Sequence, residues 1–136
     1  MRTDGSNYTI TFDGGARGNP GEGYGSYELR SDTRAEIVRL TFGNNVTNNE
    51  AEYRTLIAAL HDLIERITAQ QKRPGDYSLA IRGDSQLVIF QITGQWKVRN
   101  ARIQTLHREA VTLLDQFGTR DIRWQPRAQS VRTLGH

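Results

Sequence analysis

The sequence predicts an α/β domain built on one mixed sheet of about five strands, with helices packed against it. Three consecutive β-rich segments, separated by Gly, Asp and Ser turns, open the chain. Amphipathic helical patterns then alternate with further strands, in the order βββαβααβ. This order favours an antiparallel meander joined to parallel crossovers. A chain of 136 residues is large enough for one core, and we expect a single domain over residues 1–136.

The first three strands are expected at Tyr8–Asp13, Gly23–Arg30 and Glu36–Gly43, where residues alternate or are β-rich. Four glycines lie among the eight residues that follow Asp13, which favours a turn there. Glycine has no Cβ, so such a segment also lets a ligand approach the backbone closely.

The clearest helix is expected at Asn49–Ala69, after a polar loop at Asn44–Asn49. Asn48 or Asn49 can cap this helix. Its apolar residues recur at helical spacing and form one stripe: Leu56, Ala59, Leu60, Leu63, Ile64 and Ile67.

The second half of the chain continues the alternation after a loop at Gln70–Asp76. Its elements are expected at Tyr77–Arg82 (strand), Ser85–Gln91 (short helix), Asn100–Phe117 (amphipathic helix) and Asp121–Gln125 (strand). Gly118 ends the last helix, and Pro126 ends the last strand.

The composition excludes several classes of site. The chain has no cysteine, which excludes disulfides and thiolate chemistry, and its three scattered histidines do not favour a zinc site. It shows no membrane span and no signal-peptide core, so we expect a cytoplasmic protein. The net charge is +3 and only Lys72 and Lys97 are lysines. An arginine-rich surface suits a nucleic-acid partner, although such a surface is equally expected of a protein from a GC-rich or high-temperature source.

Three carboxylates occupy special positions. Asp13 closes the first expected strand, and Asp84 follows the fourth and opens the next helix. Glu52 lies one turn before Leu56 and so points along the buried stripe. The first and fourth strands are expected neighbours, and ligands gather at the carboxyl ends of such strands. The three side chains can therefore converge on divalent cations.

Each carboxylate also has a purely structural explanation. Asp13 can precede a hairpin turn, Asp84 can cap a helix, and Glu52 can interact with the helix dipole. Their joint placement favours the metal site, in which two Mg²⁺ ions about 4 Å apart support phosphodiester hydrolysis.

Four segments resemble, in order and spacing, the motifs of type 1 ribonuclease H: Asp13–Gly21, Thr47–Tyr53, Gly83–Val88 and Trp124–Arg127. The chain is similar to the compact form, which lacks a basic protrusion after the second helix. This resemblance spans nearly the whole chain and implies a ribonuclease H-like fold that cleaves the RNA strand of RNA–DNA hybrids. It also implies two Mg²⁺ or Mn²⁺ ions with substrate. We further expect a monomer and no membrane partner.

The resemblance further implies roles for individual residues. Asp13, Glu52 and Asp84 would be the catalytic metal ligands, with Asp13 bridging both ions. Thr47 with Asn49 would hold a DNA-strand phosphate, and Trp96 and Lys97 would meet the DNA strand, although Trp96 can also simply pack at a helix end. The residues implied for the minor groove, where the 2′-hydroxyl identifies RNA, are Gly14, Gly15, Ala16, Asn19, Asn48, Asn49 and Gln86.

The sequence departs from the family pattern at its end. The family motif Pro-Arg-x-x-Asn-x-x-Ala-Asp supplies a fourth carboxylate, but here Leu134 stands at that position, with Ser130 and Thr133 replacing the Asn and Ala. We therefore expect a C-terminal helix that is missing or vestigial. His136 is a poor replacement because imidazole binds Mg²⁺ weakly, and Asp121 is expected at the wrong end of its strand.

Two functional hypotheses follow. The first is a metal-dependent ribonuclease H, impaired by the loss of the fourth carboxylate. The second is a catalytically weak or inactive domain of the same fold that binds RNA–DNA hybrids. A domain whose carboxylates only cap helices is a remote third, because four motifs lie in register.

Overall fold

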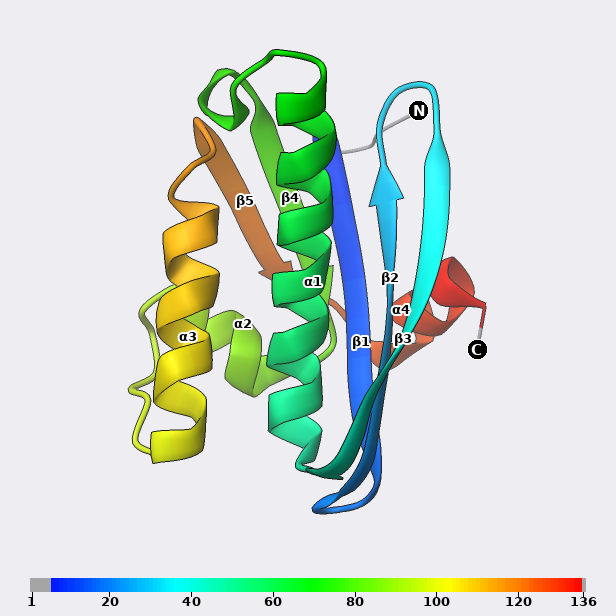
Figure 1. Ribbon diagram of the computed structural model, residues 1–136, viewed down its shortest axis with the longest axis vertical. Helices are drawn as coiled ribbons and strands as arrows, with labels where there is room; N and C mark the ends of the chain where they lie inside the picture. Colours follow the sequence, from blue (N-terminus) through cyan, green and yellow to red (C-terminus); the bar gives the residue numbers. More distant parts are fainter. Residues whose placement is uncertain (1–5, 136) are drawn as a thin grey trace.

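The computed structural model describes residues 6–135 of the chain. Its sheet has five strands in the order β3-β2-β1-β4-β5 (Figure 1). The β1–β2 and β2–β3 pairs are antiparallel, whereas β4 runs parallel to both β1 and β5. The predicted mixed sheet is confirmed. Its strands are β1 (Tyr8–Gly18), β2 (Gly21–Arg30), β3 (Ala35–Val46), β4 (Ser78–Gly83) and β5 (Thr119–Trp124).

The first strand is longer than expected. The prediction that Asp13 closes it is wrong, because β1 stays paired with β2 from Asp13↔Ser26 to Gly18↔Gly21. The turn is confined to residues 19–20. The parallel pairing of β1 with β4 does end here, at Phe12↔Gly83. Asp13 in β1 and Asp84 directly after β4 are therefore each the first residue beyond that pairing.

Two long helices cover one face of the sheet. α1 (Asn48–Ala69) and α3 (Ala101–Leu114) lie side by side, and the short α2 (Gln86–Ile92) lies near one end of both (Figure 1). The expected stripe of α1 is buried apart from Ile64, which is partly exposed. It packs on β1 and belongs to one buried cluster with Ile10 and Phe12 of β1 and with Leu79 and Ile81 of β4, all four of which are fully buried. This contact forms the main core.

The start of α1 is capped by Thr47, not by Asn48 or Asn49 as expected. The Thr47 hydroxyl accepts the Glu50 N–H at 3.1 Å, and the Glu50 carboxylate accepts the Thr47 N–H at 2.9 Å. This reciprocal pair is a capping box. Arg102 of α3 reinforces it with an ion pair to Glu50 at 2.7 Å and a hydrogen bond to the Asn45 carbonyl at 2.8 Å. The Asn48 side chain is left for other contacts.

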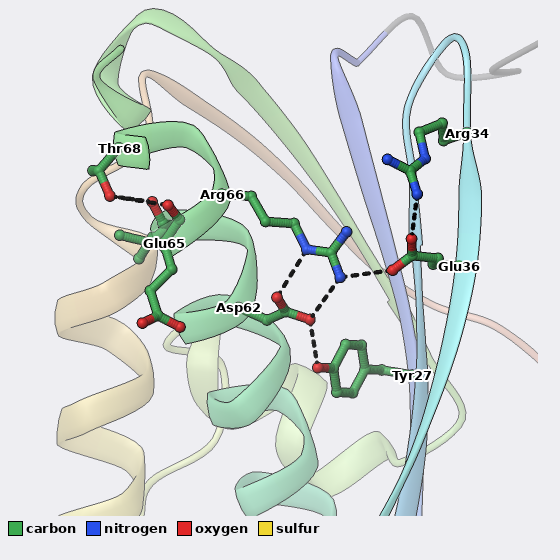
Figure 2. A network of polar contacts seen from close by, with 8 residues as sticks. Tyr27, Arg34, Glu36, Asp62, Glu65, Arg66 and Thr68 are labelled. Carbon is green, nitrogen blue, oxygen red and sulfur yellow. Dashed lines mark hydrogen bonds and ion pairs between the residues drawn. The ribbon is translucent and has the colours of Figure 1, made fainter. Parts of the chain in front are cut away.

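A polar network holds the second half of α1 against the β2–β3 hairpin (Figure 2). Asp62 accepts hydrogen bonds from the Tyr27 hydroxyl at 2.7 Å and from Arg66 at 2.8 Å. Arg66 and Arg34 each bind Glu36 at 2.6 Å. A hollow of about 570 Å³ adjoins this network. Arg34 and Arg66 line this hollow, and both are already paired with Glu36. The hollow lies at the opposite end of α1 from Glu52.

The C-terminal segment forms a short helix, so of the two expected outcomes, a missing or a vestigial helix, the structure shows a short helix. α4 (Arg127–Leu134) has eight residues, about two turns, and packs on the face of the sheet opposite α1 (Figure 1). It ends at Gly135, whose φ of 78° is the left-handed conformation common after a helix. Leu134 is fully buried, and its carbonyl accepts a hydrogen bond from Arg39 at 3.2 Å. His136 lies outside the described residues. Across residues 6–135, no helix has the length and apolar character needed to cross a membrane.

Candidate metal centre

The three carboxylates of Asp13, Glu52 and Asp84 meet at one end of the sheet. One oxygen from each lies within 4.8 Å of the others. Asp13 comes from β1 and Asp84 from the residue directly after β4, both at the level where the β1–β4 pairing ends, and the first turns of α1 supply the glutamate. The oxygens Asp13 Oδ1, Glu52 Oε2 and Asp84 Oδ2 are buried and make no hydrogen bond to the protein. Such a set of unpartnered oxygens is chemically suited to a hard divalent cation.

The electrostatics of this cluster favour a cation as well. Burial, reinforced by the negative charges of Asp13 and Asp84, raises the pKa of Glu52 well above its ordinary value. Burial and the charge of Asp13 also raise the pKa of Asp84, and this rise is opposed by the guanidinium of Arg127. Arg127 Nη1 lies 3.8 Å from Asp84 Oδ2. Without a cation, the cluster is therefore costly to ionise fully.

The glycine after Asp13 brings β1 against the start of α1. A Cβ on Gly14 would lie 2.6 Å from the carbonyl carbon and oxygen of Ala51, and 2.7 Å from the Glu52 nitrogen. Real Cβ atoms do not approach backbone this closely, so any other residue would push strand and helix apart. Gly14 therefore permits the short distance between Asp13 and Glu52.

An open pocket of about 460 Å³ surrounds the cluster. Besides the carboxylates, it is lined by Gly14, Gly15, Asn48 and Asn49, four of the residues expected to contact substrate. Ala16 and Asn19 are joined to it through Asn48. The Asn48 carboxamide oxygen accepts the Ala16 N–H at 2.8 Å, and the Asn48 N–H donates to the Asn19 side chain at 3.0 Å.

The other expected contact residues lie outside this pocket. Thr47 uses its hydroxyl in the capping box, and Gln86 is exposed in the first turn of α2. Trp96 and Lys97 are exposed in the segment between α2 and α3. The Trp96 ring also packs on Phe90, with ring centroids 5.0 Å apart, so the packing explanation for Trp96 holds at least in part.

The pocket contains four residues that the sequence reasoning did not assign to the site: Tyr24, Ser85, Trp124 and Arg127. Trp124 and Arg127 belong to a motif that was identified, but neither residue type marks a metal site. Tyr24 is opposite Gly15 in the β1–β2 pairing, and a Cβ on Gly15 would meet its hydroxyl at 2.6 Å. Only the register of β2 could have placed it here.

Asp121 lies away from the cluster, as expected. It is opposite Ala80 in the β4–β5 pairing and binds Arg82 at 3.1 Å and Arg123 at 2.8 Å. Leu134, at the position of the family's fourth carboxylate, offers no ligand atom.

Comparison with known proteins places the chain in a family. Residues 28–132 match the family model described as "Reverse transcriptase-like". A bifunctional protein of Mycobacterium tuberculosis is 37% identical over 123 residues, which are 89% of this chain and 32% of that protein. Ribonuclease HI of Halobacterium salinarum is 36% identical over 123 residues, which are 89% of this chain and 57% of that protein. The chain thus spans about a third to a little over half of the length of these relatives.

Solved structures of similar proteins match nearly the whole chain. The crystal structure of RNase H1 from Halobacterium salinarum has a TM-score of 0.75 at 36% identity, and the match covers 93% of this chain and 90% of that one. The crystal structure of LC11-RNase H1 in complex with an RNA/DNA hybrid has a TM-score of 0.80 at 26% identity, with 93% and 90% covered. With these matches and the carboxylate cluster together, the chain belongs to the ribonuclease H1 family.

Proposed function

We propose that the chain is a metal-dependent endonuclease that hydrolyses the RNA strand of RNA–DNA hybrids. The observation that carries this proposal is the convergence of three buried, unpartnered carboxylate oxygens beside a pocket lined by glycines and asparagines. One relative is named ribonuclease HI, and one similar structure was solved with an RNA/DNA hybrid. We further propose that the protein acts as a monomer in the cytoplasm.

Asp13, Glu52 and Asp84 would hold the metal, which we propose to be two Mg²⁺ or Mn²⁺ ions in the presence of substrate. Bound ions of this kind supply an activated water and stabilise the leaving oxygen. The fit rests on the three oxygens, which accept no hydrogen bond from the protein, and on the raised pKa of Glu52, which a nearby cation would lower. The residues of the chain hold these acids in place and bind the hybrid around them.

The pocket lining supports the proposed recognition of the minor groove. Gly14 and Gly15 expose backbone at its wall, and Asn48 and Asn49 add amide groups that can meet ribose hydroxyls. Asn48 also fixes the positions of Ala16 and Asn19 through the two hydrogen bonds described above. Gln86 would extend this surface.

The DNA strand would meet a second group of residues. Thr47 and Asn49 lie at the N-terminus of α1, where backbone N–H groups and the helix dipole favour a phosphate. Trp96 and Lys97 present an aromatic ring and a positive charge on the segment between α2 and α3, which suits a sugar–phosphate backbone.

A second candidate function is hybrid binding with little or no hydrolysis. One observation favours it: Leu134 stands at the position of the fourth carboxylate and is fully buried, and none of the residues of α4 (Arg127–Leu134) is acidic. Three carboxylates would then have to bind the ions without it.

The deciding experiment uses an RNA–DNA hybrid labelled on the RNA strand, incubated with Mg²⁺, Mn²⁺ or EDTA. The proposed function predicts cleavage to 5′-phosphate ends that depends on metal and disappears in Asp13→Asn. Binding of the hybrid without cleavage in either metal would establish the second function. Leu134→Asp should then raise the rate, and an unchanged rate would show that Leu134 is not the defect.

A further inference from the structure

Trp124 stands directly beside a proposed metal ligand. It is the last residue of β5, and the β4–β5 pairing places it opposite Gly83, the residue before Asp84. Its indole N–H donates a hydrogen bond to the Asp84 backbone carbonyl at 3.0 Å. Trp124 lines the pocket and is 40% exposed.

The backbone around Asp84 depends on this neighbour. Asp84 lies between the end of β4 and Ser85, which caps α2, so the β4 ladder no longer holds it. Two consecutive residues of the β5 end tie this junction to the sheet. The Gln125 N–H donates to the Gly83 carbonyl at 2.9 Å, and the Trp124 indole binds the next carbonyl along.

The Asp84 side chain is under electrostatic stress in the absence of metal. The charge of Asp13 repels it, and the nearest cation is Arg127 at 3.8 Å, on a side chain that is largely exposed. An exposed arginine contributes little positional restraint. A fixed backbone is then the main means of keeping the carboxylate aimed at Asp13 and Glu52.

We propose that Trp124 is a positioning residue that fixes Asp84 through its indole N–H and thereby sets the affinity of the site for divalent ions. This inference rests on the metal site of the proposed function. It assigns no contact between Trp124 and the ions, since the indole acts through the Asp84 backbone. Hydrogen-bonding partners that orient a ligand commonly change metal affinity by about 10- to 100-fold when removed.

The test measures Mn²⁺ and Mg²⁺ binding to the whole chain by isothermal titration calorimetry. Trp124→Phe removes the N–H and keeps an aromatic ring. Benzothienylalanine at position 124 is the sharper variant, because sulfur replaces only the N–H and the ring shape is kept. Trp96→Phe is the matched control, since Trp96 is the other tryptophan and is similarly exposed, at 46%.

Both changes at position 124 should weaken ion binding about tenfold, while Trp96→Phe leaves it unchanged. Amide exchange in residues 83–88 of the metal-free protein should also become faster in both variants, which reports the loss of backbone restraint without any metal. Cleavage by the two variants at position 124 should recover at higher metal concentration.

Unchanged ion affinity in both variants, with Asp84→Asn losing it, would overturn the role of Trp124 and leave the proposed function standing. If the wild-type protein binds ions but does not cleave the hybrid, the proposed hydrolysis is contradicted. The calorimetry would still decide the role of Trp124. Wild-type protein that binds no divalent ion would overturn both.

Discussion

At the scale of single residues, the candidate site is built at a cost to the stability of the metal-free protein. Glu52 is buried beside two other acids, and the like charges raise its pKa. Glu28 is a contrasting case, because it is equally buried but binds the Arg30 guanidinium at 3.1 Å. Two buried glutamates of one chain thus have opposite electrostatic surroundings.

We expect Glu52→Gln to stabilise the metal-free protein by about 1 kcal/mol, because the amide removes a buried charge from a repulsive cluster. The same change should abolish most of the stabilisation that Mg²⁺ gives the wild type, since ions stabilise a folded state only by binding to it. Urea unfolding in EDTA and in Mg²⁺ measures both effects. Glu28→Gln is the control and should lower stability in both conditions; a loss of stability for Glu52→Gln in EDTA would show that the cluster is not under stress.

At the scale of the elements, a buried side-chain network holds the segment that carries Trp96 and Lys97. The Tyr53 hydroxyl of α1 donates to the Gln91 side chain of α2 at 2.7 Å, and the Gln91 amide donates to the Lys97 carbonyl at 3.2 Å. His107 of α3 contacts the Gln91 carbonyl at 3.1 Å. Three helices and the proposed DNA-binding segment therefore meet at Gln91.

Tyr53→Phe should destabilise the protein by about 1 to 3 kcal/mol, because it leaves a buried oxygen of Gln91 without its donor. Hydrogen exchange should rise in residues 93–100, and the KM for hybrid should increase more than kcat falls. Tyr77→Phe is the matched control, because the Tyr77 ring packs on Tyr8 at the other end of the sheet and should leave this segment unaffected. Unchanged exchange in residues 93–100 would contradict the proposed link.

The β4–β5 pair is joined by an ion-pair cluster that should respond to pH. Burial favours a higher pKa for Asp121, but hydrogen bonds and the charges of Arg82 and Arg123 outweigh it and lower that pKa below 3.8. A lowered pKa in the folded state means that the stabilisation is present above the unfolded-state value and is lost as pH falls through the folded-state value.

Asp121→Asn should therefore destabilise the protein by about 1 kcal/mol at neutral pH. The difference from wild type should shrink as the pH falls below 3.8 and vanish once Asp121 is protonated in both states. Denaturant unfolding at a series of pH values measures this difference. Asp76→Asn removes an exposed, 3.5 Å pair with Arg73 and should have almost no effect at any pH. A constant difference across the series would show that the Asp121 pair does not titrate as argued.

Sequence periodicity predicted the elements well where buried residues recur at a regular spacing. It predicted them less well where the pairing of strands decides the structure. The stripe of α1 followed from the spacing that one buried face of a helix imposes, and the β1–β4 neighbourhood followed from the helix that crosses between these strands. Gly14–Gly18 suggested a turn by local preference, but hydrogen bonds to β2 keep these residues in a strand. Thr47, and not Asn48 or Asn49, caps α1 because Glu50 stands three residues later, and this capping-box spacing is present in the sequence. Trp124 and Tyr24 lie at the site because of the register of their strands, and no local sequence pattern predicts that register.

At the scale of the whole molecule, the acidic centre is set in a chain of net charge +3. The binding of a polyanion then depends on where the positive charges lie, not only on their sum. The chain offers a direct way to separate the two effects, because it has two lysines. Lys72 lies in the connection after α1 and Lys97 in the connection between α2 and α3, and these connections are toward opposite ends of the molecule (Figure 1).

Lys97→Ala and Lys72→Ala remove the same charge, so any difference in hybrid binding between the two variants is due to the position of the lysine. In an Asp13→Asn background that does not cleave, Lys97→Ala should weaken hybrid binding several-fold and reduce the slope of log K against log salt by about 0.7 to 0.9, the loss of one phosphate contact. Lys72→Ala should leave both quantities near those of the parent, because its end of α1 is remote from the carboxylates. Fluorescence anisotropy with a labelled hybrid at several salt concentrations measures affinity and slope together. Equal losses in the two variants would mean that overall charge, and not the segment between α2 and α3, attracts the hybrid.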